Sequence, residues 1–286
     1  MTATFLVAEV IGGLRANSLA LLSDAAHMFT DVAALAISLA AIGIARRPTD
    51  RKRSFGYYRF EILAAAFNAL LLFGVAIYIL IEAYLRFKNP PEIQSTTMLV
   101  IASIGFIVNL ISIRLLTAGK DSSLNVKGVY LEVWSDLLGS VGVIVGALVI
   151  RFTGWLWVDT VVAVGIGLWV LSRTWVLLKQ SLHILLEGVP EEIDYAAVEQ
   201  LLARHPGVLA VHDLHVWALT SGKISLTAHL VHDATIADAS ALRQAIEVPL
   251  AKDFGIRHTT LQLETTPCHQ AGNDGEHFGD VTHPRP

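Results

Sequence analysis

Long apolar runs are the feature of this sequence that most constrains its fold. Five of them reach or exceed the twenty or so residues that a helix needs to cross the hydrocarbon core of a bilayer. They lie at roughly residues 18–45, 59–86, 96–118, 127–151 and 157–182. A further run, at residues 2–14, is too short to span at about 1.5 Å per residue. We therefore expect an all-α membrane domain of six helices, with the first helix truncated at its N-terminus.

Composition divides the chain into three parts. Of the 286 residues, 53% are hydrophobic and 16% are charged, whereas about 25% of residues are charged in an average soluble protein. The apolar runs end before residue 187, and ordinary soluble composition follows. We predict a transmembrane domain at residues 1–186, a soluble domain at 187–266, and a disordered tail rich in Gly and polar residues at 267–286.

Charge and cysteine content limit which partners the protein can have and which compartment its soluble parts occupy. The formal net charge of −4 is too small to indicate nucleic acid as a partner. One cysteine, Cys268, excludes an internal disulfide framework, as expected in a reducing compartment. Lys and Arg concentrate in the connector "ARRPTDRKRSFGYYR" at residues 45–59. The positive-inside rule then places this connector, the N-terminus and the soluble domain in the cytoplasm.

Two of the apolar runs carry ionisable pairs at membrane depth. His27 and Asp31 are four residues apart in one run, and Glu132 and Asp136 are four apart in another. Ionisable side chains are costly in hydrocarbon, so they indicate function there. Residues i and i+4 share one face of a helix. If the two faces meet, one imidazole and three carboxylates form a plausible tetrahedral ligand set for a divalent transition metal.

An alternative for each pair is interhelical hydrogen bonding that only stabilises packing. Two matched pairs favour metal, because three carboxylates without a cation repel one another. Asp24, one turn before His27, is a weaker candidate that either faces a vestibule or forms a local hydrogen bond.

Four motifs carry a resemblance to a known family. They are "SLALLSDAAHMFTD", "FGYYRFEILAAAFNALL", "YLEVWSDLLGSVGV" and "HDLHVWALTSG". With them nearly the whole chain resembles a cation diffusion facilitator, and most resembles the bacterial heavy-metal branch that exports cadmium, zinc and cobalt. The resemblance implies a homodimeric transporter of the bacterial inner membrane, not an enzyme. The resemblance further implies exchange of cytoplasmic Zn²⁺, and also Co²⁺, for protons by alternating access, with Cd²⁺ or Ni²⁺ as further candidate substrates.

The resemblance also implies specific site residues. The four transport ligands map onto His27, Asp31, Glu132 and Asp136. In the family resembled here, most zinc-selective members carry a His-x-x-x-Asp motif at the position of Glu132 and Asp136. Glu132 replaces the histidine of that motif and makes the site more anionic. That departure puts strict zinc selectivity in doubt.

A charge interlock between the membrane and soluble domains is implied at Arg59 and Glu187. The alternative for Arg59 is a solvated cation that only obeys the positive-inside rule. Related bacterial zinc transporters often carry histidines in the connector before Arg59, but this connector has none. We therefore predict that a metal site there is absent or very weak.

The soluble domain is predicted to be a small ferredoxin-like α+β fold. Amphipathic helices are expected at residues 194–204 and about 238–253. Two alternating strands joined at Ser221-Gly222 lie between them, and the segment "HTTLQLETT" predicts a third strand. The order α-β-β-α-β is that of a ferredoxin-like sandwich, which the family resemblance also implies.

Histidines crowd these strands. They are His212, His215, His229, His232 and His258, with Glu264 and Cys268 nearby. Strand alternation predicts His212 and Leu214 on one face, and His215 and Trp217 on the other. So many histidines in a short domain favour a metal site over isolated surface or core residues. The resemblance implies that the domain dimerises and binds metal through His212, His229, His258 and Glu264.

Two other functions remain to be weighed. A membrane-anchored metal sensor would use the cytoplasmic histidines, but it gives the charged intramembrane pairs no purpose. An intramembrane metalloenzyme needs an open metal position and a general base, and the sequence contains no H-E-x-x-H motif.

Overall fold

The computed structural model describes residues 2–117 and 124–266, without the side chains of residues 2–4, 31, 34, 35, 38, 124–129, 131 and 132. The predicted disordered tail at 267–286 lies outside the described residues. The chain forms two compact units. The first contains Met1–Ala41 and Ala64–Lys179, and the second contains Ile42–Leu63 and Gln180–Pro286.

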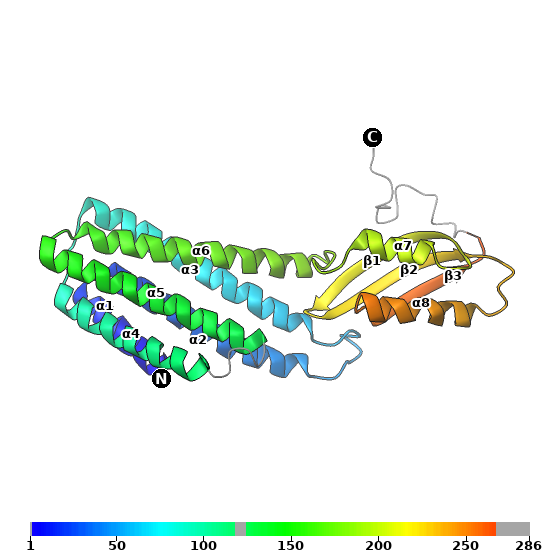
Figure 1. The fold of residues 1–286 in the computed structure, drawn as a ribbon, viewed down its shortest axis with the longest axis horizontal. Helices are drawn as coiled ribbons and strands as arrows, with labels where there is room; N and C mark the ends of the chain where they lie inside the picture. The colour runs from blue at the N-terminus through cyan, green and yellow to red at the C-terminus, as the bar shows by residue number, and fades with distance from the viewer. Residues whose placement is uncertain (1, 118–123, 267–286) are drawn as a thin grey trace. The chain divides into compact units, whose positions relative to one another are not determined.

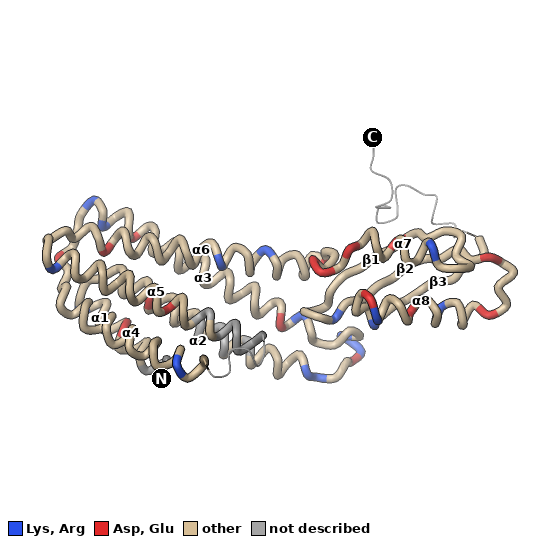
Figure 2. Tube along the Cα trace, viewed as in Figure 1, with Lys and Arg blue, Asp and Glu red and all other residues tan. Residues whose placement is uncertain are grey.

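Long helices occupy the N-terminal two-thirds of the chain (Figure 1). They are α1 (Thr2–Ala16), α2 (Leu19–Ala45), α3 (Arg59–Lys88), α4 (Ser95–Thr117), α5 (Leu124–Thr153) and α6 (Trp157–Leu185). Among the described residues, α3, α4, α6 and residues 133–153 of α5 are long and apolar enough to cross a membrane. The α2 span, and with it the count of six, stays a prediction because several α2 side chains are not described. Figure 2 shows stretches of these helices without Lys, Arg, Asp or Glu.

Small side chains fill the centre of the first unit. The buried core of this unit includes alanines 2% exposed or less on all six helices, among them Ala16, Ala20, Ala83, Ala102, Ala147 and Ala163. Lipid tails are as apolar as a leucine side chain, so membrane helices associate through close packing, which small residues permit. Many large apolar side chains face outward, as Leu115 and Phe152 do, while others such as Met98 are buried in the core.

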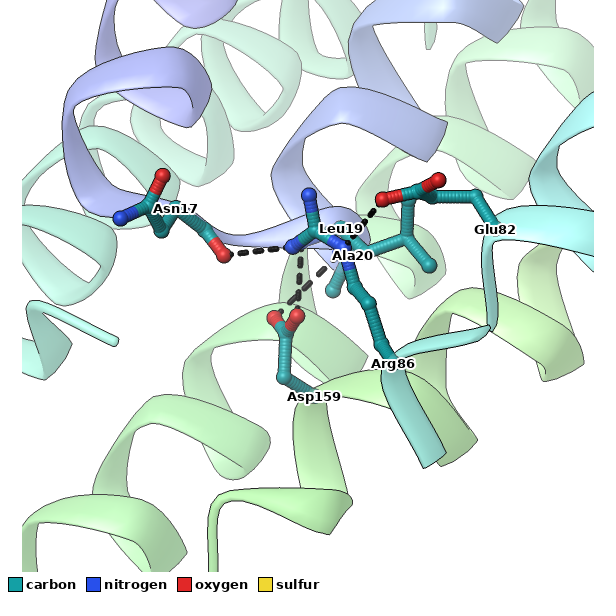
Figure 3. Close-up of polar contacts among 6 residues, drawn as sticks. All are labelled: Asn17, Leu19, Ala20, Glu82, Arg86 and Asp159. Carbon is teal, nitrogen blue, oxygen red and sulfur yellow. Dashed lines mark hydrogen bonds and ion pairs between the residues drawn. The ribbon is translucent and has the colours of Figure 1, made fainter. Parts of the chain in front are cut away.

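A buried carboxylate holds the turn between α1 and α2 (Figure 3). Asp159, in the first turn of α6, accepts hydrogen bonds from the Leu19 N–H at 2.7 Å and from the Ala20 N–H at 3.3 Å. It also accepts one from Ser18 Oγ at 2.5 Å. Arg86 of α3 donates to the backbone oxygen of Asn17 at 2.7 Å. Asp159 therefore caps the N-terminus of α2 from a different helix, and three segments meet at this turn.

The second unit contains a three-stranded mixed sheet with two helices. Its elements are α7 (Tyr195–Ala203), β1 (Val208–Thr220), β2 (Lys223–His232), α8 (Ala239–Asp253) and β3 (His258–Glu264). β2 lies between β1, with which it pairs antiparallel, and β3, with which it pairs parallel. The predicted α-β-β-α-β order and the hairpin turn at Ser221-Gly222 are confirmed, and Gly222 takes the positive φ of 73° that such a turn favours. The α7 and α8 side chains share one core with the sheet.

A bulge in β1 overturns one expectation about its faces. His212 pairs with His229 and His215 pairs with Thr227, so three steps on β1 oppose two on β2. Asp213 supplies the extra residue with a left-handed φ of 49°. His212 and His215 therefore lie on the same face, away from the helices, whereas Leu214 points into the core. Strict alternation was wrong here because the bulge shifts it by one residue.

Candidate functional site

The candidate intramembrane site lies where His27 of α2 and Asp136 of α5 come together. His27 Nε2 of α2 lies 3.6 Å from Asp136 Oδ1 of α5, and the two side chains are 11% and 12% exposed. The structure thus brings together one residue from each predicted pair. Asp31 and Glu132 lie one helical turn away on the same two helices. Their side chains are outside the described residues, so their part in the site stays a prediction.

A cavity of about 180 Å³ opens beside His27. It is lined by residues of α2, α5 and α6, namely Asp24, His27, Ser135, Leu138, Gly139, Gly165, Ile166, Trp169 and Val170. A water molecule occupies about 30 Å³ in the liquid, so the cavity has room for a cation with part of its hydration shell. A buried imidazole nitrogen and carboxylate oxygens at its edge are ligand types that suit divalent transition metals.

Two further carboxyl groups lie close to this pair. Asp24 is 4% exposed, and a Cβ atom added to Gly139 would lie 3.1 Å from Asp24 Oδ1. The missing side chain at Gly139 therefore lets Asp24 lie against α5. Glu9 of α1 is 1% exposed and interacts with both Asp24 and Asp136. The sequence patterns do not predict Glu9, although a lone acid inside the first apolar run was the available signal.

The cytoplasmic candidate site joins β1, β2 and β3. Each of His212, His229 and Glu264 offers a ligand atom within 4.8 Å of the others. His229 Nδ1 lies 2.9 Å from Glu264 Oε1, and His212 Nε2 lies 3.3 Å from Glu264 Oε2. Gln262 Nε2 donates to Glu264 Oε1 at 2.6 Å. Two imidazoles around one carboxylate form a set of nitrogen and oxygen ligands that a transition metal can use.

His258 lies outside this cluster. It begins β3 opposite Ser225, whereas Glu264 ends the strand opposite Val231. Six steps at about 3.3 Å each separate the two residues by roughly 20 Å. The ring of His258 instead contacts the ring of Phe55, with centroids 5.7 Å apart. The structure brings three of the four predicted cytoplasmic ligands together and leaves His258 apart.

The predicted interlock residues are in contact. Arg59 Nη2 at the start of α3 lies 2.6 Å from Glu187 Oε1, just beyond the end of α6. Close by, Thr220 at the end of β1 donates to Glu61 Oε2 of α3 at 2.9 Å. These contacts tie the first turn of α3 to the chain after α6 and to the sheet, all within the second unit.

Two family models match the chain. The model of the cation efflux transmembrane domain matches residues 1–186, and that of the cation efflux protein cytoplasmic domain, ZT_dimer, matches residues 190–266. The chain belongs to the cation diffusion facilitator family. The resemblance carried by the sequence motifs and the predicted fold class are confirmed. As its name indicates, the cytoplasmic-domain model points to dimerisation of this facilitator.

Relatives named as metal transporters align with nearly the whole chain. It is 64% identical over 278 residues to the metal cation efflux system protein CzcD of Cupriavidus metallidurans, covering 97% of this chain and 88% of that protein. It is 42% identical to the cadmium, cobalt and zinc/H(+)-K(+) antiporter of Bacillus subtilis (93% and 86% covered) and 41% identical to the zinc transporter ZitB of Escherichia coli (94% and 86%). This facilitator is therefore an integral membrane protein for efflux of divalent metal cations.

The solved structures that match this facilitator include one of a related cytoplasmic domain. It is described as the metal-bound C-terminal domain of the CzcD transporter from Cupriavidus metallidurans. The match covers 25% of this chain and 99% of that chain, at 44% sequence identity and a TM-score of 0.24.

Proposed function

We propose that the protein exchanges cytoplasmic Zn²⁺, and also Co²⁺, for protons by alternating access, with Cd²⁺ or Ni²⁺ as further substrates. The proposed ligands are His27 and Asp31 of α2 with Glu132 and Asp136 of α5. The observation that carries the proposal is the contact between the largely covered side chains of His27 and Asp136, which joins one member of each pair across two helices. Relatives named for zinc, cobalt and cadmium support these substrates.

Proton exchange follows from the ligand chemistry. Metal binds a neutral imidazole and ionised carboxylates, so binding releases protons and protonation expels metal. An unperturbed histidine titrates near pH 6.5, which suits exchange between a near-neutral cytoplasm and a more acidic exterior. Alternating access then requires the helices to rock around a fixed site near the middle of the membrane.

We further propose a homodimer with the N-terminus and the soluble domain in the cytoplasm of a bacterial inner membrane. The proposed limits are residues 1–186 for the transmembrane domain and 187–266 for the cytoplasmic domain. The dimerisation model at residues 190–266 supports the assembly, and the positive-inside rule supports the orientation. The His212, His229 and Glu264 cluster is proposed to bind Zn²⁺ in a structural or regulatory role.

A pH step separates this proposal from a membrane-anchored metal sensor. Purified full-length protein is reconstituted into vesicles with equal zinc on both sides, and the lumen is then acidified relative to the bath. If the protein exchanges zinc for protons, zinc accumulates in the acidic lumen against its own gradient. Adding Co²⁺, Cd²⁺ or Ni²⁺ as competitors then ranks these ions as substrates. A sensor binds zinc but leaves its distribution unchanged.

Glu132→His should narrow the metal range. A carboxylate at this position leaves one imidazole among oxygen ligands, and such sites discriminate less sharply for tetrahedral zinc. We expect zinc flux to persist, the zinc-to-cobalt flux ratio to rise about tenfold, and transport to fail at a higher pH than in the wild type. That pH shift arises because a second imidazole must lose its proton before metal binds. Equal ratios in wild type and variant at every pH would remove Glu132 from the ligand set.

Single histidine variants test the cytoplasmic site. In an Asp136→Asn background, which silences the membrane site, His212→Ala or His229→Ala should weaken zinc binding at least about tenfold, because each removes one ligand nitrogen. Competition with a chromophoric chelator on the full-length protein measures the affinity. His258→Ala is the matched control and should bind zinc like its parent. Equal losses in all three variants would place His258 in the site.

Reversed charges test the contact between Arg59 and Glu187. Arg59→Glu or Glu187→Arg alone places two like charges together, and each should slow zinc flux severalfold. The double reversal restores opposite charges and should recover most of the flux. The pair is 37% and 60% exposed, so its effect on the free energy of unfolding is at most about 1 kcal/mol. A double variant no faster than either single variant would leave Arg59 as a solvated cation.

A further inference from the structure

A cavity of about 720 Å³ lies in the second unit. Its walls come from the connector between α2 and α3, the first turns of α3, Glu187 and Val189 after α6, Tyr195 of α7, and strands β1 and β2. A second cavity of about 660 Å³ shares Ser54, Phe55, Tyr58 and Leu219 with it and continues along β2 to the start of β3. Neither cavity contains the clustered His212, His229 and Glu264.

The charges around these two cavities are nearly all positive. Lys52, Arg53 and Arg59 line the first cavity, and Lys223 and Arg257 line the second. The acid among the lining residues is Glu187, which pairs with Arg59. In the part of the chain that the structure describes, no carboxylate lies within ion-pair distance of Lys52 or Arg53. The two cavities together thus offer a cationic environment that suits a phosphate group.

The cations are held in place by aromatic rings. The guanidinium carbon of Arg53 lies 5.2 Å from the ring centres of both Tyr57 and Phe60. Lys223 Nζ lies 4.4 Å from the ring centre of Tyr58. These cation–π contacts fix the positive groups before any ligand arrives, which lowers the entropy cost of binding.

The connector is itself ordered by a single carboxylate. Asp50 accepts hydrogen bonds from the Tyr57 hydroxyl at 2.6 Å and from the N–H groups of Lys52 and Arg53 at 2.8 Å each. The Tyr57 hydrogen bond is the main reason that the pKa of the Asp50 carboxyl group is lowered. The basic connector is therefore an ordered segment, and it forms one wall of the cavity.

We propose that these cavities bind the headgroup of an anionic phospholipid from the cytoplasmic leaflet. Arg59 begins a membrane-spanning helix and Glu187 follows another, so the first cavity opens where two spans end. Phe55 and Leu63 are each 48% exposed at its rim and offer apolar surface to an acyl chain. The positive-inside rule accounts for cations in the connector, but not for Lys223 and Arg257, which come from the soluble domain and line the adjoining cavity.

Lipid binding to the full-length protein in detergent tests this proposal. The probe is spin-labelled phosphatidylglycerol, with phosphatidylcholine as the zwitterionic comparison. A cation near an anionic lipid surface contributes about fivefold in affinity, so Arg53→Gln and Lys223→Gln should each weaken phosphatidylglycerol binding about fivefold at low salt. Arg51→Gln is the matched control, because Arg51 is exposed on the same connector but does not line either cavity. It should bind like the wild type.

Four outcomes would overturn the proposal. Equal weakening in Arg51→Gln would indicate general attraction to basic residues, and equal binding of phosphatidylcholine would remove the role of net charge. Displacement of the lipid by millimolar inorganic phosphate would identify a free anion as the ligand. Loss with Arg53→Gln but not with Lys223→Gln would confine binding to the connector and contradict a site shared with the sheet.

Discussion

Asp136→Asn should lower zinc flux at least about 100-fold while the protein still folds and dimerises. Asparagine keeps the size of aspartate but removes the charge, so the cation loses a carboxylate ligand beside His27. Changes around metal ligands, without loss of a ligand, already cost about 10–100-fold in affinity or activity. Folding should survive because the substitution keeps the side-chain size and removes a charge that is costly to hold at membrane depth. Zinc flux in vesicles, with the oligomeric state in detergent, measures both expectations.

Glu92→Gln is the control for this variant. Glu92 is an exposed acid in the connector before α4, so the substitution removes one charge outside the two helices that carry His27 and Asp136. Its zinc flux should match that of the wild type. If Asp136→Asn kept more than about half of the wild-type flux under the same conditions, the intramembrane assignment would be wrong.

Asp159→Leu should destabilise the membrane domain by about 3 kcal/mol or more. The carboxylate accepts a hydrogen bond from Ser18 Oγ. It accepts two more from the N–H groups of Leu19 and Ala20 (Figure 3). It is fully buried, so its removal leaves these donors without an acceptor. Its position near the N-termini of both α2 and α6 also favours a negative charge. Loss of a partner from a buried charged network costs about 3–5 kcal/mol.

Glu82→Gln is the comparison within the same cluster. Glu82 pairs with Arg86 one turn along α3, with Arg86 Nε 2.9 Å from Glu82 Oε1, and this pair is partly exposed. Its loss should cost less than about 1 kcal/mol. Denaturant unfolding of the detergent-solubilised proteins measures the difference in the free energy of unfolding between each variant and the wild type. Equal midpoints for Asp159→Leu and the wild type would show that Asp159 does not hold the α1–α2 turn.

Local patterns in the sequence predict the elements and one pair of facing residues. Runs of apolar residues give the long helices, and alternation gives the hairpin at Ser221-Gly222. The spacing of His27 and Asp31, matched by that of Glu132 and Asp136, predicts which helix faces meet. The contact of His27 with Asp136 agrees with that expectation. Each of these features depends on interactions within a few residues or on a periodic pattern.

Features set by long-range geometry are the ones that the sequence does not predict. The bulge at Asp213 shifts His212 to the face of His215, and nothing in the alternating pattern marks it. The approach of His212 and His229 to Glu264 depends on the register of β2 against both β1 and β3. The three hydrogen bonds of Asp159 join segments about 140 positions apart, so no local pattern indicates them.

Coupled fluxes test most directly the claim that metal and protons exchange at the contact between α2 and α5. Wild-type protein and Asp136→Asn are reconstituted at equal density, and a zinc gradient is applied with no pH difference. Zinc entry and lumenal pH are then followed together with two indicators. The account predicts proton movement opposite to zinc in the wild type, and loss of both fluxes in Asp136→Asn. Zinc entry without proton counterflow in the wild type, or coupled fluxes of normal size in Asp136→Asn, would contradict it.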